Sequence, residues 1–76
     1  MSYEENKKLL DSILNEAQGR GDAEFYGHLE RKLEQLSQTW ATKDEDGDLT
    51  REEVTRLIER KYFVLRRIEE LKRSAS

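Results

Sequence analysis

The residues that could support nucleophilic chemistry are few in this sequence. His28 is the single histidine, no cysteine is present, and Ser12 and Ser37 have only His28 as a candidate base. A nucleophile needs a base beside it and donors that hold the developing oxyanion, and no glycine-rich loop offers such donors. One histidine without cysteine also falls short of the three or four ligands of a zinc site. We therefore predict that the protein is not an enzyme.

The densest cluster of chemically active groups is the acidic stretch 42–53. With Asp44, Asp46, Gly47, Asp48, Leu49 and Glu53 in this order, it resembles the twelve-residue calcium loop of the EF-hand family. Together with the helix expected after it, the resemblance covers residues 42–58. In that family the third and fifth positions supply oxygen ligands, the sixth is Gly and the seventh supplies a backbone carbonyl. The twelfth position is a Glu that binds the ion with both carboxylate oxygens. These residues match the family's positions in order. The resemblance implies that calcium is bound and that Asp44, Asp46, Asp48 and Glu53 are its ligands.

The same stretch also fits a simple polar turn between two antiparallel helices. Thr42 stands where the family has its first Asp, and the chain holds no second loop with which to pair. In the turn interpretation the Asp residues supply turn and capping chemistry, and Gly47 supplies a positive φ angle. We take the turn without a cofactor as the primary interpretation and calcium binding as the alternative.

Composition limits the fold to one small helical domain spanning residues 1–76. A chain of 76 residues without cysteine has a thin core and no disulfide, so helix packing must stabilise it, within one chain or between copies. Hydrophobic residues make up 34% and charged residues 41%, but the apolar ones are periodic, which indicates order. The sequence has no apolar run of membrane-spanning length and no signal-peptide pattern. We expect a cytoplasmic protein.

Three amphipathic helices follow from the periodicity, and the expected fold class is all-α. The first covers about residues 3–18, with its apolar face at Leu9, Leu10, Ile13, Leu14 and Ala17. The second and third, about 22–41 and 50–73, form an antiparallel hairpin; Asp22 can cap the former, and Thr50 with Glu53 forms a capping box for the latter. We expect a three-helix bundle or a dimeric helical bundle.

Apolar steps of three and four residues mark the packing seam of the hairpin. The residues predicted to form the core and the self-association surface are Leu29, Leu33, Leu36, Trp40, Leu57, Val64, Ile68 and Leu71. A second apolar row at Ile58, Tyr62 and Leu65 widens the seam, and Lys61 interrupts it. These features favour a homo-oligomer, although Lys61 could also extend from the edge of a monomer core.

Charge is distributed unevenly, with 6 basic and 12 acidic residues in 1–50 but 8 basic and 5 acidic in 51–76. The predicted surface for a protein partner, whose identity the sequence does not give, consists of Phe25, Tyr62, Phe63, Arg60 and Arg67. The basic third helix offers nucleic-acid binding as a further alternative, which we consider unlikely because Glu52 can pair with Arg56 four residues later. The favoured function is therefore a non-enzymatic interaction or regulatory module that self-associates, and no membrane partner is expected.

Overall fold

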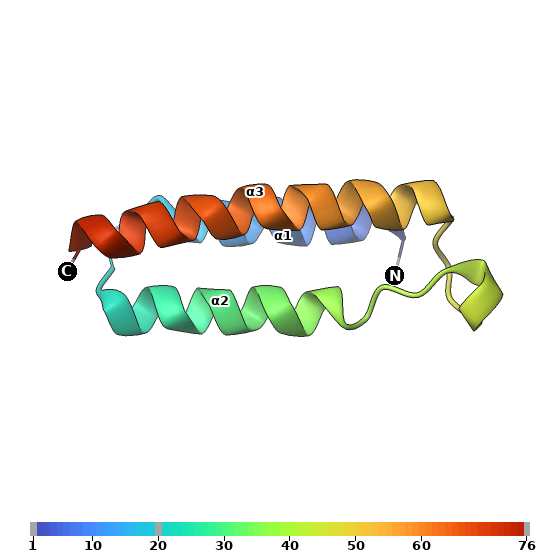
Figure 1. The fold of residues 1–76 in the computed structure, drawn as a ribbon, viewed down its shortest axis with the longest axis horizontal. Coiled ribbons are helices and arrows are strands. Elements are labelled where there is room, and N and C mark those ends of the chain that lie inside the picture. Colours follow the sequence, from blue (N-terminus) through green and yellow to red (C-terminus); the bar gives the residue numbers. More distant parts are fainter. Residues whose placement is uncertain (1, 20, 76) are drawn as a thin grey trace.

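The protein is an elongated bundle of three helices, with principal extents of 43 × 15 × 15 Å. The computed structural model describes residues 2–19 and 21–75. Its elements are α1 (Tyr3–Ala17), α2 (Ala23–Ser37), a single 3-10 turn η1 (Lys43–Glu45) and α3 (Arg51–Ala75). In Figure 1, α3 runs most of the length of the molecule, α2 lies antiparallel to it, and α1 lies parallel to it. All three helices contact one another, which confirms the all-α prediction.

Each helix begins at a side chain that satisfies its free backbone N–H groups. The Ser2 hydroxyl and the Asp22 carboxylate accept hydrogen bonds from backbone N–H groups three residues later, at 3.2 and 2.9 Å. At α3, the Glu53 N–H donates to Thr50 Oγ1 at 3.1 Å and the Thr50 N–H donates to Glu53 Oε1 at 2.9 Å. The caps predicted at Asp22 and Thr50 are therefore present.

The second helix is shorter than its periodicity predicts, because α2 ends at Ser37 and not near residue 41. Two hydroxyls at its end bond back to helix carbonyls: Ser37 Oγ donates to Glu34 O at 2.8 Å and Thr39 Oγ1 donates to Leu36 O at 2.7 Å. Trp40 Nε1 donates to Asn6 Oδ1 on α1 at 3.0 Å, a contact between elements that the periodicity of the second helix does not show. Trp40 lies in the connection after α2, where it still packs against the core.

The core is enclosed within one chain. Its buried apolar members are Leu10, Ile13, Ala17, Tyr26, Leu29, Leu33, Leu49, Leu57, Val64 and Ile68. Five of the eight residues assigned to the core and self-association surface are among them, and Leu36, Trp40 and Leu71 are partly buried around them. Side chains buried in this way offer no surface to a second copy. In the part of the chain that the structure describes, no helix is both long and apolar enough to cross a membrane.

The first helix does not cover the whole wide stripe of α3. It packs along α3 and is as long as α2, with 15 residues in each, so it is a full member of the bundle. Of the second apolar row, Leu65 is partly buried, but Ile58 and Tyr62 remain 40% and 61% exposed.

Candidate functional site

The acidic connection between α2 and α3 is closed by its own backbone hydrogen bonds. The Thr42 carbonyl accepts the N–H groups of Glu45 and Gly47 at 2.9 and 2.8 Å, and the Leu49 carbonyl accepts that of Lys43 at 2.9 Å. Buried Leu49 ties this turn to the end of the core. The connection therefore has the bonding of a compact turn.

The positive φ angle in this turn belongs to Asp46 and not, as the sequence suggests, to Gly47. Asp46 has φ 61°, in the left-handed region that Asp and Asn tolerate better than most residues. Gly47 is required for a different reason: a Cβ at this position would overlap the carbonyl group of Ala41. The glycine thus permits a close backbone approach.

Two of the four carboxylates considered as calcium ligands have partners within the chain. Asp44 lies 3.4 Å from Arg51 Nη2, and Glu53 belongs to the capping box of α3. Among residues 2–19 and 21–75, no three His, Cys, Asp or Glu side chains gather in a way that could hold a metal ion. The geometry gives no support to a preformed calcium site.

The residues considered for catalysis do not converge. His28 is exposed on the surface of α2. Ser37 Oγ donates to the Glu34 carbonyl and accepts a hydrogen bond from Lys61 Nζ at 3.2 Å. Within the described ranges every buried side-chain nitrogen or oxygen has a hydrogen-bond partner, so no buried polar group is left to contact a ligand.

Carboxylates pair with the arginines of α3. Arg56 Nη2 lies 2.7 Å from Glu52 Oε1, the pair that the sequence predicts, and Arg67 Nη1 lies 3.3 Å from Glu70 Oε2. Arg60 reaches α1, where its Nε and Nη2 donate to Asp11 Oδ1 at 3.2 and 2.8 Å. These pairs reduce the positive potential that a nucleic-acid backbone would need.

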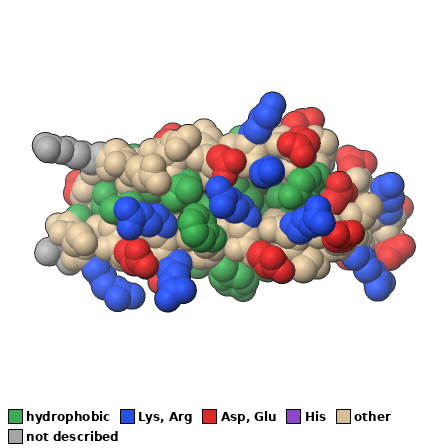
Figure 2. Space-filling view, turned by 90° about the horizontal axis from the view of Figure 1, so that it is seen from above, with side chains coloured by type: hydrophobic (Ala, Val, Ile, Leu, Met, Phe, Trp, Pro, Cys, Tyr) green, Lys and Arg blue, Asp and Glu red, His purple; other side chains and the backbone are tan. Residues whose placement is uncertain are grey.

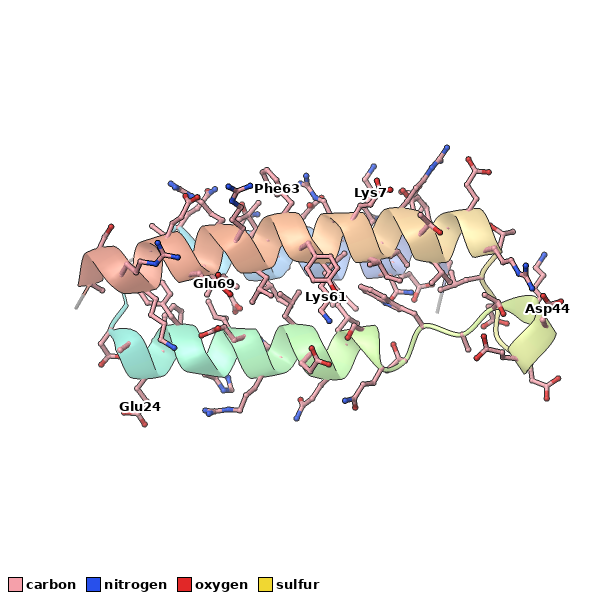
Figure 3. All side chains as sticks on the ribbon, in the orientation of Figure 1. Lys7, Glu24, Asp44, Lys61, Phe63 and Glu69 are labelled. Carbon is pink, nitrogen blue, oxygen red and sulfur yellow. The ribbon has the colours of Figure 1, made fainter. Side chains whose placement is uncertain are left out.

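Lys61, the charged residue in the apolar seam, is satisfied inside the chain. Its side chain is only 15% exposed, and its Nζ lies 2.9 Å from Glu34 Oε2 on α2. Figure 3 shows Lys61 directed toward α2, whereas Phe63 points away from it. Lys61 therefore needs no second subunit.

Ile58, Tyr62 and Phe63 are the exposed apolar residues of α3; they spread over about 140° of its outer surface, which we call the aromatic face of α3. Tyr62 and Phe63 are 61% and 56% exposed, and both rings lie near cations. The Arg60 guanidinium carbon is 5.0 Å from the Phe63 ring centre, and Lys61 Nζ is 5.8 Å from that of Tyr62. Figure 2, which looks onto α3, shows hydrophobic side chains at the surface between Lys or Arg and Asp or Glu. Phe25, predicted for the same surface, instead packs against the core, with its ring edge-on to Tyr26.

Sequence reasoning missed a second apolar surface, a groove between α1 and α2. We call it the α1–α2 groove; its volume is about 360 Å³ and its lining is Leu9, Ser12, Ile13, Glu16, Lys32, Gln35, Leu36 and Thr39. Leu9 is 40% exposed beside it. The only sequence signal was the position of Leu9, one residue before buried Leu10 and so about 100° around the helix from it.

Two apolar surfaces, the aromatic face of α3 and the α1–α2 groove, are thus the candidate sites. Comparison of the chain with protein-family models, with curated proteins and with solved structures found no match. The role of both surfaces must therefore be argued from their chemistry.

Proposed function

We propose that the protein is a non-enzymatic interaction module that binds other protein chains, copies of itself included, through apolar side chains outside its core. The observation that carries this proposal is the exposure of four large hydrophobic residues, Leu9, Ile58, Tyr62 and Phe63, around a core that the chain closes by itself. Exposed apolar area on a small domain is unfavourable by about 25 cal/mol per Å², and a partner that covers it recovers this free energy.

The aromatic face of α3 is the surface proposed for a different protein partner. Aromatic and arginine side chains contribute most to protein interfaces because they bury much area at a small loss of conformational freedom. Arg60 stacks on Phe63 and is held by Asp11, so this part of the surface is ordered before binding. Arg66, with 85% of its side chain exposed, lies on the same helix. A partner segment with apolar and acidic side chains would fit this face.

Two other functions have weaker support. A calcium-responsive loop would need Asp44, Asp46, Asp48 and Glu53 to converge on an ion; a calcium-dependent rise in melting temperature that Glu53→Gln abolishes would favour it. Nucleic-acid binding would need the arginines of α3 to exchange their carboxylate partners for phosphates. A cytoplasmic location also remains a prediction.

Affinity capture with matched variants tests the proposal. The wild-type chain, the double variant Tyr62→Ser/Phe63→Ser and a control, Arg31→Ser/Gln38→Ser, are immobilised and exposed to a lysate of the source cells. Because all four positions are exposed, circular dichroism should show the same helical content for every chain. We expect a protein that the wild type and the control retain and the Tyr62/Phe63 variant loses. Equal retention by all three chains would contradict the role of the aromatic face.

A further inference from the structure

Of the three pairs of helices in the bundle, α1 and α2 make the fewest contacts with each other. Ion pairs join α3 to both neighbours: Asp11 with Arg60 on one side, and Glu34 with Lys61 on the other. Between α1 and α2, Lys32 Nζ lies 3.3 Å from Glu16 Oε2 at the rim, and the groove lies beside this pair. Two antiparallel helices with apolar side chains between them are half of a four-helix bundle, which a second pair of helices would complete.

This side of the molecule presents both a protruding apolar side chain and a hollow that could receive one. Leu9 is 40% exposed, whereas Ser12 and Thr39 are short and leave room next to Ile13 and Leu36. A surface that carries knob and hole together is complementary to itself, as the interface of a two-fold dimer must be.

From the shape and charge of this side we infer that its occupant is a second copy of the chain, with α1 of each copy lying over α2 of the other. This deepens the self-association in the proposed function. The two-fold axis would run parallel to the helices. Each residue would then lie at the same height along this axis as its equivalent in the other copy. Among the four helices at the interface, each would lie antiparallel to both of its neighbours.

Charge selects this arrangement over the alternative. Glu16 on α1 and Lys32 on α2 lie at the same level, because they already form a pair within the chain. With the axis parallel to the helices, Glu16 of each copy meets Lys32 of the other, and the four charges alternate in sign. A two-fold axis perpendicular to the helices would instead lay α1 on α1 and α2 on α2, without this pairing.

The size of the surface predicts a weak, reversible dimer. Helices of 15 residues are about 22 Å long, and two of them side by side are about 20 Å wide. Their face covers about 440 Å², less than the roughly 800 Å² per partner of a standard stable interface. We therefore expect a dimer that forms at micromolar or higher concentrations.

Sedimentation equilibrium over a range of concentrations tests the role of Leu9. We expect the wild type to approach twice the chain mass of 9.0 kDa and Leu9→Gln to raise the dimer dissociation constant about tenfold or more. Ile58→Gln is the matched control, since Ile58 is also 40% exposed but lies on α3. A wild type that stays monomeric, or a larger effect of Ile58→Gln than of Leu9→Gln, would overturn the inference.

Charge reversal tests whether Glu16 and Lys32 lie at the interface, as the arrangement requires. Glu16→Lys gives four positive charges at the proposed interface and Lys32→Glu gives four negative ones, so each variant alone should dimerise less than the wild type. In a mixed dimer each lysine would face a glutamate of the other chain, although the two charges within each chain have the same sign. A heterodimer in the mixture, detected by sedimentation with one variant labelled, is therefore expected. No gain in association on mixing would overturn the arrangement, while the capture experiment on Tyr62 and Phe63 would still decide the wider function.

Discussion

At the scale of single residues, one buried polar contact joins the start of α1 to the connection after α2. Asn6 is only 2% exposed. Its Nδ2 donates to the Ser2 carbonyl at 2.9 Å, and its Oδ1 accepts a hydrogen bond from Trp40 Nε1 at 3.0 Å. Because Asn6 is buried and Trp40 is partly buried, losing one of the two groups leaves the other short of a hydrogen-bond partner. Asn6 thus fixes where Trp40 lies once α2 has ended.

Replacing Asn6 should therefore destabilise the whole chain. Asn6→Ala leaves the indole N–H of Trp40 unpaired, and we expect the free energy of unfolding to fall by about 1–3 kcal/mol. Urea unfolding, followed by circular dichroism and by emission of Trp40, the single tryptophan, measures the change. Asn15→Ala is the control, because Asn15 is exposed on the same helix. Equal stability of the two variants would show that the contact contributes little.

At the scale of elements, the sequence was sufficient to predict the helix starts, because side chains within one turn satisfy the free backbone N–H groups there. Asp22, Thr50 and Glu53 mark helix starts in the sequence because a cap needs only residues within one turn. The predicted end of α2 was too late, because the apolar period continues to Trp40 whereas the helix ends at Ser37 and the Trp40 indole bonds Asn6 of α1, a contact that the period of one helix does not show. The α1–α2 groove could not be predicted, since its opening depends on how two helices pack and not on either helix alone.

Two glycines in different elements should respond to alanine in opposite directions. Gly27 lies inside α2, and a Cβ there would meet nothing within 4 Å, so Gly27→Ala should stabilise the chain by about 0.5–1 kcal/mol. At Gly47 a Cβ would overlap the backbone of Ala41, so Gly47→Ala should destabilise it by about 1–3 kcal/mol. Thermal unfolding of both variants measures the changes. A neutral Gly47→Ala would mean that the turn can open without loss to the core.

At the scale of the whole molecule, the bundle is long and thin. Its accessible surface is 5365 Å², against about 4,900 Å² expected for a compact chain of 9.0 kDa. Ion pairs between the acidic first part and the basic α3, such as Asp11 with Arg60 and Glu30 with Lys72, join helices along this length. Each partly exposed pair is worth at most about 1 kcal/mol, so the enclosed apolar core must supply most of the stability.

The enclosed core predicts that the chain folds as a monomer, even though we propose that it dimerises. Leu29, Leu33, Leu57, Val64 and Ile68 are buried without a second copy, so dilution below the dimer range should leave helical content and cooperative unfolding intact. On dilution the melting temperature should fall only slightly, because the chain then loses the small stabilisation that dimerisation provides by mass action. Circular dichroism melts at low and high concentration, with Leu9→Gln as the weakened dimer, measure this. If the helical signal vanished on dilution, these seam residues would have to lie between subunits. Folding would then require the dimer, and the subunits would not meet through the α1–α2 groove.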